Sequence, residues 1–478
     1  MQAQWLKPRK VAKRIVISGL LQLETPTHLG NGDVDGPLDM PLHLDPLEGK
    51  ALLTGASLAG ALRNYLSIYL RDSDAKDLFG YVDGNRSIES RVIIDDALAT
   101  GNFSTELRDG VAIQPETRTA KKDMKFDIEL LAAGTEFPIR IELNLPADEA
   151  KAKTLKQTLG WALDALGRGD IALGKRKRRG FGKVKVARWQ VDEYDLTTSA
   201  GLKSWLQTPV EVQTPDSQRN DDLLAKLGVD KPLETPIAKL TATFRIDGSL
   251  LIRSAVGDAA GPDFEHLKSE RAGKGMAPVL SGTSVAGAMR ARALRIANTL
   301  GMNGDAIADD LFGYRPKDRK DKTPMTASRI WVEETVIERP LELVHTRVAI
   351  DRFTGGAYPG ALFSEQPLFG TPETQVEIRC WIPNPREWEI GLLLLLLKDL
   401  WTGDLPLGGE SSIGRGRLQG LEATLTVKDK QWTIKRKENA DSAEEDSDQL
   451  EFAGDPIAEL ENYLQYFLTY GKPMESES

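Results

Sequence analysis

The chain has 478 residues, of which 40% are hydrophobic and 28% charged. This indicates a globular protein of roughly two or three domains and excludes a disordered or fibrous one. The longest apolar run, residues 392–397, is far shorter than the roughly 20 residues of a membrane span, and no apolar stretch follows the basic start, so we expect a cytoplasmic protein. The single cysteine, Cys380, excludes an internal disulfide and a cysteine zinc cluster.

Charge is distributed unevenly along the chain. The formal net charge is −9, but from Glu438 onward there are twelve acidic residues and one basic residue, so residues 1–437 carry +2. Within that part, residues 175–185 hold seven Lys and Arg side chains. Such a run attracts phosphate, although a solvated loop or helix face explains it equally well.

The first regular element is an alternating strand at residues 14–24, followed by a glycine-bearing loop that leads to residues 53–63. Residues 53–63, LTGASLAGALR, indicate a tight turn that enters an amphipathic helix. The same succession returns with an alternating strand at 239–246 and the segment LSGTSVAGAMR at 280–290. The two halves of the chain therefore start in the same way.

Further segments repeat in the same order. They are 77–81 with 310–314, 90–94 with 328–332, 169–174 with 403–408, and Gly180 and Gly182 with Gly414 and Gly416. The offset between partners drifts, as small loop insertions require. Together with the helix entries, these colinear matches indicate two homologous domains.

The expected fold class is α+β. Strands and helices interleave in each half without the regular succession of a parallel doubly wound sheet, which predicts a ferredoxin-type layer in each domain. Thr-Pro dipeptides and a polar run favour a linker between the halves. The expected division is a first domain at 1–195, a linker at 196–236, a second domain at 237–430, and an acidic tail at 431–478.

Two features are expected within the acidic tail. Residues 437–449 are poor in apolar side chains, which predicts disorder. Residues 456–470 have an amphipathic pattern, which predicts a short terminal helix that is able to dock on a neighbour.

Two glycine-rich loops lie at matching positions, residues 174–182 and 408–416. Without Cβ atoms, their backbone amides can approach a phosphate closely. Neither loop has the ending of a nucleotide P-loop or the downstream acid of a Rossmann fingerprint, which argues against a mononucleotide cofactor. A tight turn between a helix and a strand is the structural alternative. The duplication, and the basic residues of the first loop, favour a polynucleotide backbone.

The segments that start at residues 112 and 349 each lead to a basic or glycine-rich tip and then to a strand. They are typical of projecting hairpins. Basic side chains there could contact phosphates, and Phe353 or Tyr358 could stack on bases. An ordinary hairpin with a solvated tip is the alternative.

The loop at residues 30–45 holds four acids and a histidine. A carboxylate there could position an RNA 2'-hydroxyl, accept its proton or hold a divalent ion. Acids are equally common in turns, where they bond their own backbone. The four histidines have no metal-ligand spacing, and each is expected to be structural; they are His28, His43, His266 and His345.

Together these features resemble the RAMP (repeat-associated mysterious protein) superfamily, and within it the fused backbone subunits of type III (III-D-like) CRISPR effector complexes. The helix entries, the Leu-Phe-Gly tripeptides, the run at 349–356 and both glycine-rich loops carry the resemblance, which covers most of residues 12–190 and 237–425. It implies two tandem RRM/ferredoxin-like domains, each with a thumb hairpin. The thumbs would interrupt a guide:target RNA duplex at regular intervals.

The resemblance also implies a metal-dependent endoribonuclease that acts on target RNA. In active relatives an aspartate in the loop before the helix motif drives the cleavage, and Asp39 matches that position. The implied cofactor is a divalent metal ion, magnesium first, whose ligands are unknown. In the second domain an ungapped offset of 227 places His266 opposite Asp39, and the nearest aspartate is Asp263. Either the loop shifts and Asp263 cuts, or this domain only binds.

The expected RNA contacts come from the helix entries, the hairpins and the glycine-rich loops. They are Ser57, Arg63, Arg118, Lys121, Lys122, Gly174, Lys175, Arg176, Lys177, Arg178, Arg179, Gly180, Phe181, Gly182, Ser284, Arg290, Arg347, Arg352, Phe353, Gly408, Gly409, Gly414, Arg415 and Gly416.

The expected partners are guide CRISPR RNA, complementary target RNA, and other RAMP-type and large subunits of an effector complex, with no membrane. A scaffold that holds guide RNA without cutting is the main alternative. A guide-processing ribonuclease is a further one, disfavoured because the sequence places no plausible histidine base near the glycine-rich loops.

Overall fold

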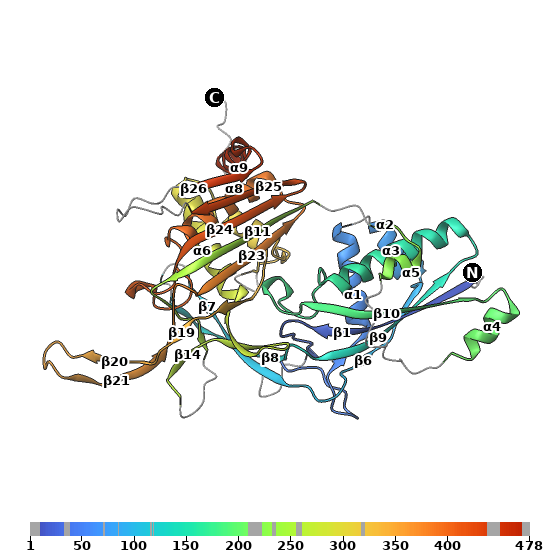
Figure 1. The fold of residues 1–478 in the computed structure, drawn as a ribbon, viewed down its shortest axis with the longest axis horizontal. Coiled ribbons are helices and arrows are strands. Elements are labelled where there is room, and N and C mark those ends of the chain that lie inside the picture. The colour runs from blue at the N-terminus through green and yellow to red at the C-terminus, as the bar shows by residue number, and fades with distance from the viewer. Residues whose placement is uncertain are drawn as a thin grey trace.

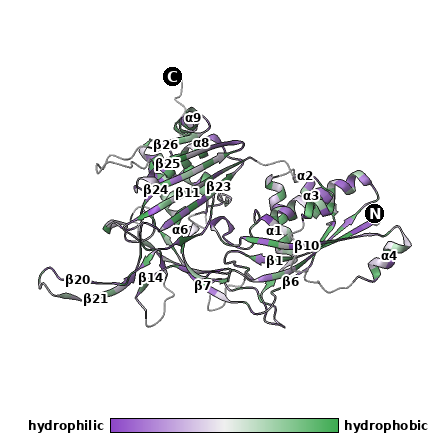
Figure 2. Cartoon of the chain, in the orientation of Figure 1, coloured by the Kyte–Doolittle hydropathy of each residue, from purple (hydrophilic) through white to green (hydrophobic). Residues whose placement is uncertain are grey.

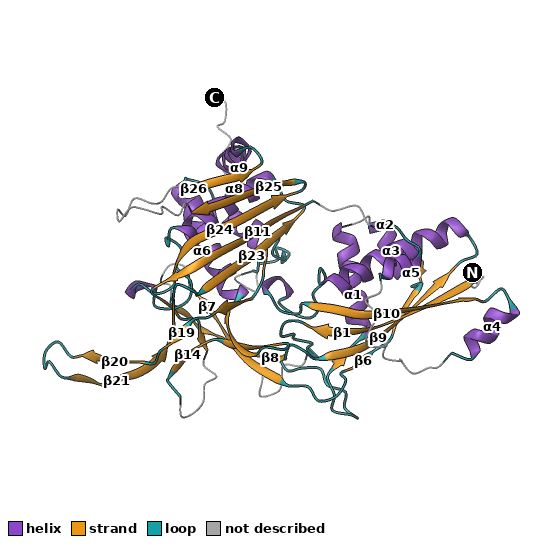
Figure 3. Ribbon diagram, in the orientation of Figure 1, coloured by secondary structure: helices purple, strands orange, loops and turns teal. Residues whose placement is uncertain are grey.

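The computed structural model describes residues 10–32, 39–69, 72–84, 86–114, 117, 119–208, 222–231, 236–254, 261–316, 321–436 and 450–470. These residues form two domains, each with an antiparallel sheet and helices packed against it (Figure 1). Figure 3 shows that each domain contains both helices and strands. The mixed α+β architecture expected from the sequence is confirmed.

The first domain is built on a four-stranded sheet in the order β10-β1-β9-β5, in which all neighbours are antiparallel. Its main elements follow one another as β1 (Lys13–Leu23), α1 (Gly55–Tyr69), β5 (Val92–Ile94), β9 (Glu136–Leu145), α3 (Glu149–Arg168) and β10 (Val184–Asp195). Asp148 caps α3 by accepting a hydrogen bond from the N–H of Lys151, and Gly169 ends the helix with φ 84°. The smaller elements are β2 (Leu52–Leu53), α2 (Asp72–Phe79), β3 (Tyr81–Asp83), β4 (Arg86–Ile88) and β6 (Ala97–Leu98).

The second domain repeats this order in a larger sheet. Its main elements are β11 (Ile237–Asp247), α6 (Gly282–Thr299), β17 (Trp331–Val332), β18 (Thr335–Glu338), β23 (Gln375–Pro383), α8 (Glu387–Trp401) and β24 (Arg417–Val427). The sheet runs β18-β23-β11-β24, with β17 also on β23, and continues on both sides. The smaller elements are β12 (Ser249–Leu250), β13 (Arg253–Ser254), β14 (Phe264–His266), β15 (Lys268–Arg271), β16 (Gly275–Leu280), α7 (Gly304–Phe312), β19 (Leu341–Glu342) and β22 (Leu368–Phe369).

Each domain has a hydrophobic core between its sheet and its helices. Side chains of β11 alternate between buried and exposed, as a strand with one covered face requires. Hydrophobic and hydrophilic residues alternate along the strands of both sheets in Figure 2. No helix of the described part of the chain is long and apolar enough to cross a membrane.

The segment expected to be a linker contains two helices, α4 (Ser199–Leu206) and α5 (Leu223–Leu227). Leu223, Leu224 and Leu227 of α5 are all buried, and α5 contacts α3 and β10. Residues 222–231 therefore pack with the first domain, because Leu223 and Leu227 of this helix are part of its hydrophobic core. Residues 209–221 and 232–235 lie outside the described residues.

The segment expected to be an acidic tail also belongs largely to a domain. Two strands, β25 (Lys430–Arg436) and β26 (Leu450–Gly454), extend the second sheet beyond β24. The predicted terminal helix is confirmed as α9 (Ile457–Tyr470). Residues 437–449, expected to be disordered, lie outside the described residues.

Helix α9 packs on α8 of its own domain instead of remaining free for a neighbour. The Tyr470 ring stacks on Trp388 with 4.5 Å between the ring centres. A Cβ at Gly391 would lie 2.1 Å from the carbonyl oxygen of Tyr463, so only glycine permits this close approach.

Candidate cleavage and RNA-binding site

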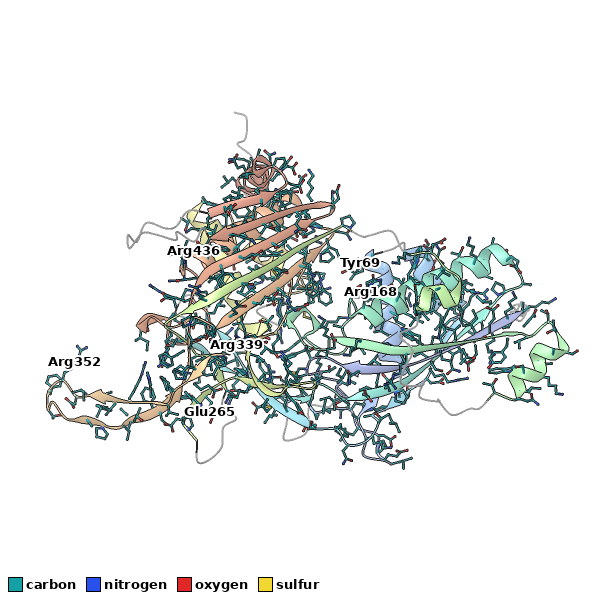
Figure 4. All side chains as sticks on the ribbon, in the orientation of Figure 1. Tyr69, Arg168, Glu265, Arg339, Arg352 and Arg436 are labelled. Carbon is teal, nitrogen blue, oxygen red and sulfur yellow. The ribbon has the colours of Figure 1, made fainter. Side chains whose placement is uncertain are left out.

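A long antiparallel hairpin leaves each domain. The first is formed by β7 (Thr105–Ile113) and β8 (Ala120–Leu131), and the second by β20 (His345–Ile350) and β21 (Ala357–Gln366). The second hairpin projects far from both sheets (Figure 1), and Arg352 lies at its tip (Figure 4).

The outer parts of both hairpins are exposed. Phe353 is fully exposed (101%), and Tyr358 is exposed on the same hairpin. Lys121 and Lys122 are exposed on β8, whereas Arg118 lies outside the described residues.

Asp39 lies at the base of the first hairpin and is exposed. Its Oδ2 accepts a hydrogen bond from the backbone N–H of Asp127 at 2.9 Å. The next residue, Met40, forms a parallel bridge with Ile128, and Met40 also accepts a hydrogen bond from Glu129 N at 3.1 Å. The loop before the first helix is thus fastened along strand β8.

Asp263 has the same arrangement at the base of the second hairpin and is also exposed. Its Oδ2 accepts a hydrogen bond from the backbone N–H of Ser364 at 2.7 Å, and the next residue, Phe264, pairs in parallel with Glu365 of β21. Ser364 and Glu365 of the second hairpin therefore correspond to Asp127 and Ile128 of the first. Asp263 is thus the structural counterpart of Asp39.

This counterpart corrects the ungapped alignment of the two loops. In the first domain Gly30 pairs antiparallel with Leu42, and in the second Arg253 pairs antiparallel with His266. His266 therefore matches Leu42 and not Asp39. The two loops differ by insertions on either side of the aspartate, which an ungapped comparison cannot register.

His266 is part of the core, as expected for a structural histidine. It is 2% exposed, its Nε2 lies 3.0 Å from the carbonyl oxygen of Val279, and its Nδ1 accepts a hydrogen bond from Ile252 N. Burial lowers the pKa of His266 to about 4.

The two aspartates can each supply one oriented carboxylate. Hydrogen bonds from the backbone N–H and the hydroxyl of Ser364 lower the pKa of Asp263, so it stays ionised near neutral pH. Among the described residues there is no cluster of three or more His, Cys, Asp or Glu side chains that could hold a metal ion. A magnesium ion commonly takes one or two carboxylates and completes its shell with waters and substrate phosphates. A single exposed aspartate at each hairpin base fits that mode of binding.

A cavity of about 320 Å³ lies between the first glycine-rich loop and the start of α1. Two histidines line it together with polar and basic side chains; the lining includes His28, His43, Thr54, Ser57, Gly174, Lys175 and Lys177. The sequence suggested no plausible histidine base near the glycine-rich loops, whereas the structure places His28 and His43 beside the first of them, because residues far apart in sequence meet here.

The loop is held tightly against His28. Lys175 N donates a hydrogen bond to the carbonyl oxygen of His28 at 3.2 Å, and a Cβ at Gly174 would lie 2.2 Å from that oxygen. The His28 ring is buried, with Nδ1 2.8 Å from the carbonyl oxygen of Glu129, and burial lowers its pKa. His28 is thus held rigidly in the wall of the cavity, whereas His43 is the half-buried histidine there.

The second domain lacks the chemistry of this cavity. Hydrogen bonds fix the matches: Gly409 N donates to Leu251 O as Lys175 N donates to His28 O, and Leu267 N donates to Ile252 O as His43 N donates to Leu29 O. The counterparts of His28, His43, Lys175 and Lys177 are therefore Leu251, Leu267, Gly409 and Ser411.

Part of the basic loop faces the second domain instead of solvent. Arg178 donates a hydrogen bond to the carbonyl oxygen of Ser328, and Arg179 donates one to that of Ile330 at 3.2 Å. Burial and neighbouring arginines lower the pKa of Arg179 to about 10. A Cβ at Gly180 would lie 2.2 Å from Glu334 N. These side chains, predicted to contact RNA, hold the two domains together.

Phe181 was also predicted to contact RNA, but it is 3% exposed and packs with Ile128 and Leu130. A hydrophobic ring is favoured in this interior position because burial removes it from water. Arg176 lies with its guanidinium 4.3 Å from the centre of the Phe126 ring, at the base of the first hairpin.

In the second domain, several residues that were predicted to contact RNA are likewise engaged with other parts of the protein. Arg415 is 3% exposed and pairs with Glu365 and Glu410, both at 2.8 Å. Arg290 pairs with Asp309 and donates hydrogen bonds to two backbone carbonyls. Arg347 and Ser284 are half-buried.

The loop glycines are explained by packing within each domain. A Cβ at Gly182 or at Gly416 would lie 1.9 Å from the carbonyl oxygen of Leu173 or Leu407, respectively, and one at Gly408 would lie 2.4 Å from that of Leu251. Gly414 is open among the described residues. Arg63 lines a groove of about 710 Å³ beside α2 and β3.

Sequence reasoning missed His43 and Thr54 as cavity residues. The signal was present in the acidic loop, where His43 follows Asp39 by four residues, but its proximity to Lys175 depends on tertiary packing.

The family comparison agrees with this two-domain architecture. The family model described as the RAMP superfamily matches residues 20–185 and 243–419, which is one region in each domain. No curated protein matches the chain. The matched regions cover more than half of the sequence and include both hairpins, both glycine-rich loops and both aspartates, so the chain belongs to the RAMP superfamily.

Proposed function

We propose that this chain is a guide-RNA-binding backbone subunit of a type III, III-D-like CRISPR ribonucleoprotein, and that it cuts complementary target RNA at Asp39 and Asp263 with a divalent metal ion. Membership in the RAMP superfamily supports a CRISPR-associated RNA-binding subunit. The observation that carries the cleavage is the matched position of two exposed aspartates at the bases of two hairpins. The proposal includes a cytoplasmic location and neighbouring effector subunits.

The order of elements in each domain supports an RRM/ferredoxin-like fold. Both domains run strand, helix, two strands, helix and strand, with the last strand beside the first. The two hairpins correspond to the thumbs of this proposal, with exposed lysines on one and Phe353 on the other.

The aspartates would act as oriented carboxylates. A backbone N–H holds one oxygen of each, which fixes the direction of the group before RNA binds. When bound, a divalent ion, magnesium first, would polarise the scissile phosphate. Asp39 and Asp263 would each hold such an ion, together with oxygens of the RNA.

The test uses the purified complex with a guide and a labelled complementary RNA, with and without Mg²⁺. We expect Asp39→Asn and Asp263→Asn each to lower the rate at which one discrete product forms by at least about a hundredfold. The reason is that several kcal/mol of charge stabilisation is lost. RNA affinity should change little. Asp45→Asn is the matched control, since Asp45 lies in the same loop and its carboxylate accepts hydrogen bonds from Leu47 N and Glu48 N of a turn.

If wild type and all variants give the same products, the chain is a scaffold that binds guide RNA without cutting it. If only Asp39→Asn removes a product, the second domain binds and does not cut.

One observation favours a second candidate, the guide-processing ribonuclease. His43 lies in a cavity with Lys175, Lys177 and Ser57, a set that could bind a phosphate and accept the proton of a 2'-hydroxyl. Such cleavage would persist in EDTA, fail in His43→Ala and be unaffected by Asp39→Asn. Target cleavage should show the opposite pattern.

A further inference from the structure

The contact between the two domains joins two different surfaces. The donor surface belongs to the first domain and consists of Arg108 and residues 178–180; the acceptor surface belongs to the second domain and consists of Phe312 and residues 328–334. Arg108 donates two hydrogen bonds to the carboxylate of Glu334, at 2.7 and 3.0 Å, and both side chains are buried. Arg178 lies over the Trp331 ring, 5.4 Å from its centre.

Because the domains are homologous, each carries a copy of both surfaces. The matches along the glycine-rich loop and the hairpin place His345, Ser412, Ile413 and Gly414 of the second domain where the first has Arg108, Arg178, Arg179 and Gly180. This second donor surface is open. Ile413 is 54% exposed, and Gly414 has the φ of Gly180, 90° against 91°, with no described atom near its Cβ position.

The first domain likewise presents a second acceptor surface. Ser90 matches Ser328, since each hydroxyl bonds the carbonyls of the same two neighbouring positions. Phe79 then matches Phe312, and Ile93 matches Trp331. Ile93 is 46% exposed where Trp331 is 7% exposed. A groove of about 710 Å³, lined by Phe79 and Gly80 among others, lies where the second domain receives Arg179.

The two open surfaces do not fit each other chemically. The used acceptor surface binds guanidinium groups through the carbonyls of Phe312, Ser328 and Ile330 and through Glu334. The open acceptor surface keeps the backbone carbonyls and has Asp96 at the position of Glu334. The open donor surface offers a histidine, a serine and an isoleucine in place of three arginines.

We propose that the open acceptor surface of the first domain binds a different protein, one that presents a glycine-rich loop carrying arginines, and that this chain does not dock head-to-tail on a second copy of itself. The inference is independent of RNA cleavage. Head-to-tail contacts between identical chains form closed rings or open filaments, depending on whether the rotation between neighbours closes. Because the second donor surface has no arginine at these three positions, this chain would be limited to one copy at such a junction.

The test introduces three arginines on the second donor surface and measures self-association of the full RNA-free chain by sedimentation velocity. We expect the wild type to remain monomeric at micromolar concentrations. The triple variant His345→Arg, Ser412→Arg, Ile413→Arg should self-associate at least about a hundredfold more tightly, since each hydrogen bond to a charged group contributes on the order of tenfold. Adding Ile93→Lys on the acceptor surface should abolish that association.

A matched control carries new arginines elsewhere, at Leu47 and Leu206, which are 93% and 74% exposed. It should stay monomeric, and thermal melting should show that every variant is folded. A folded triple variant that stays monomeric would overturn the proposed partner chemistry. Wild-type self-association that Ile93→Lys and Ile413→Lys each abolish would show that the partner is a second copy.

Discussion

The two glycine-rich loops have the same backbone and different roles. Arg176 and Glu410 occupy matched positions with φ 57° and 59°, and both loops continue into a single 3-10 turn, η1 (Lys177–Arg179) and η2 (Ser411–Ile413). The first loop carries five consecutive basic residues, of which Arg178 and Arg179 donate hydrogen bonds to the second domain. The second carries Glu410, which pairs with Arg253 at 2.7 Å inside its own domain.

The interior beside these loops differs in the same way. Phe181 packs on Ile128 in the first domain, and the matched positions hold Arg415 and Glu365 in the second. An apolar pair and an ion pair thus fill the same place in one fold. The comparison teaches that the glycines preserve the loop shape, while the side chains decide whether a loop serves a domain junction, a ligand or the interior.

The largest effect should follow from breaking the junction. Glu334→Ala would leave the buried Arg108 and Arg271 without their shared carboxylate, and breaking a buried pair costs about 3–5 kcal/mol. We expect the unfolding free energy, measured in urea, to fall by that amount and the two domains to unfold separately. Glu338→Ala, at an exposed pair with Lys274, should cost less than about 1 kcal/mol. Equal effects of the two variants would contradict a junction held by Glu334.

The next largest effect concerns the buried ion pair of Arg415 and Glu365, which stands where the first domain has Phe181 and Ile128. Glu365→Ala should destabilise the second domain by about 3 kcal/mol, because Arg415 keeps only Glu410 as a partner. The double variant Glu365→Ile, Arg415→Phe copies the pair of the first domain and should be within about 1 kcal/mol of wild type, since apolar replacement of buried ion pairs is often neutral. Urea unfolding distinguishes these outcomes. A double variant less stable than Glu365→Ala would show that the two interiors are not interchangeable.

A smaller effect concerns pH. The pKa of His266 is about 4 in the folded protein against 6.5 for an ordinary histidine, so the unfolded chain binds more protons between these values. Stability of the second domain should therefore fall as pH drops from about 6.5 to about 4, by up to about 3 kcal/mol. His266→Gln, which keeps a donor and an acceptor, should flatten this pH dependence of the unfolding free energy. Parallel curves for wild type and variant would exclude His266 as the cause.

The smallest effect concerns RNA binding by the two glycine-rich loops, which we expect to differ. Lys175→Ala and Lys177→Ala should each reduce the slope of log affinity for single-stranded RNA against log salt by about 0.7, the change for one phosphate contact. Ser412→Ala in the matched loop should leave the slope unchanged. Fluorescence anisotropy over a salt series measures both, and equal slopes for all variants would assign these lysines to the protein alone.

The sequence by itself determined the duplication, the mixed α+β class, the hairpin segments and the terminal helix. These features depend on local periodicity, glycine positions and repeated motifs, which a chain displays in linear order. The acidic loop before the helix entry was also visible in the sequence, but only the resemblance to the RAMP superfamily singled out Asp39 among its four acids.

Only the tertiary structure decided which residue of the second domain matches Asp39. The match depends on how a loop pairs with a hairpin strand about a hundred residues later, and small insertions on either side of the aspartate hide it from alignment. The same reason explains why Arg178 and Arg179 belong to a junction and why His43 lies beside Lys175. Contacts between distant segments are set by strand pairing and packing, whereas composition and spacing report only that charge is present.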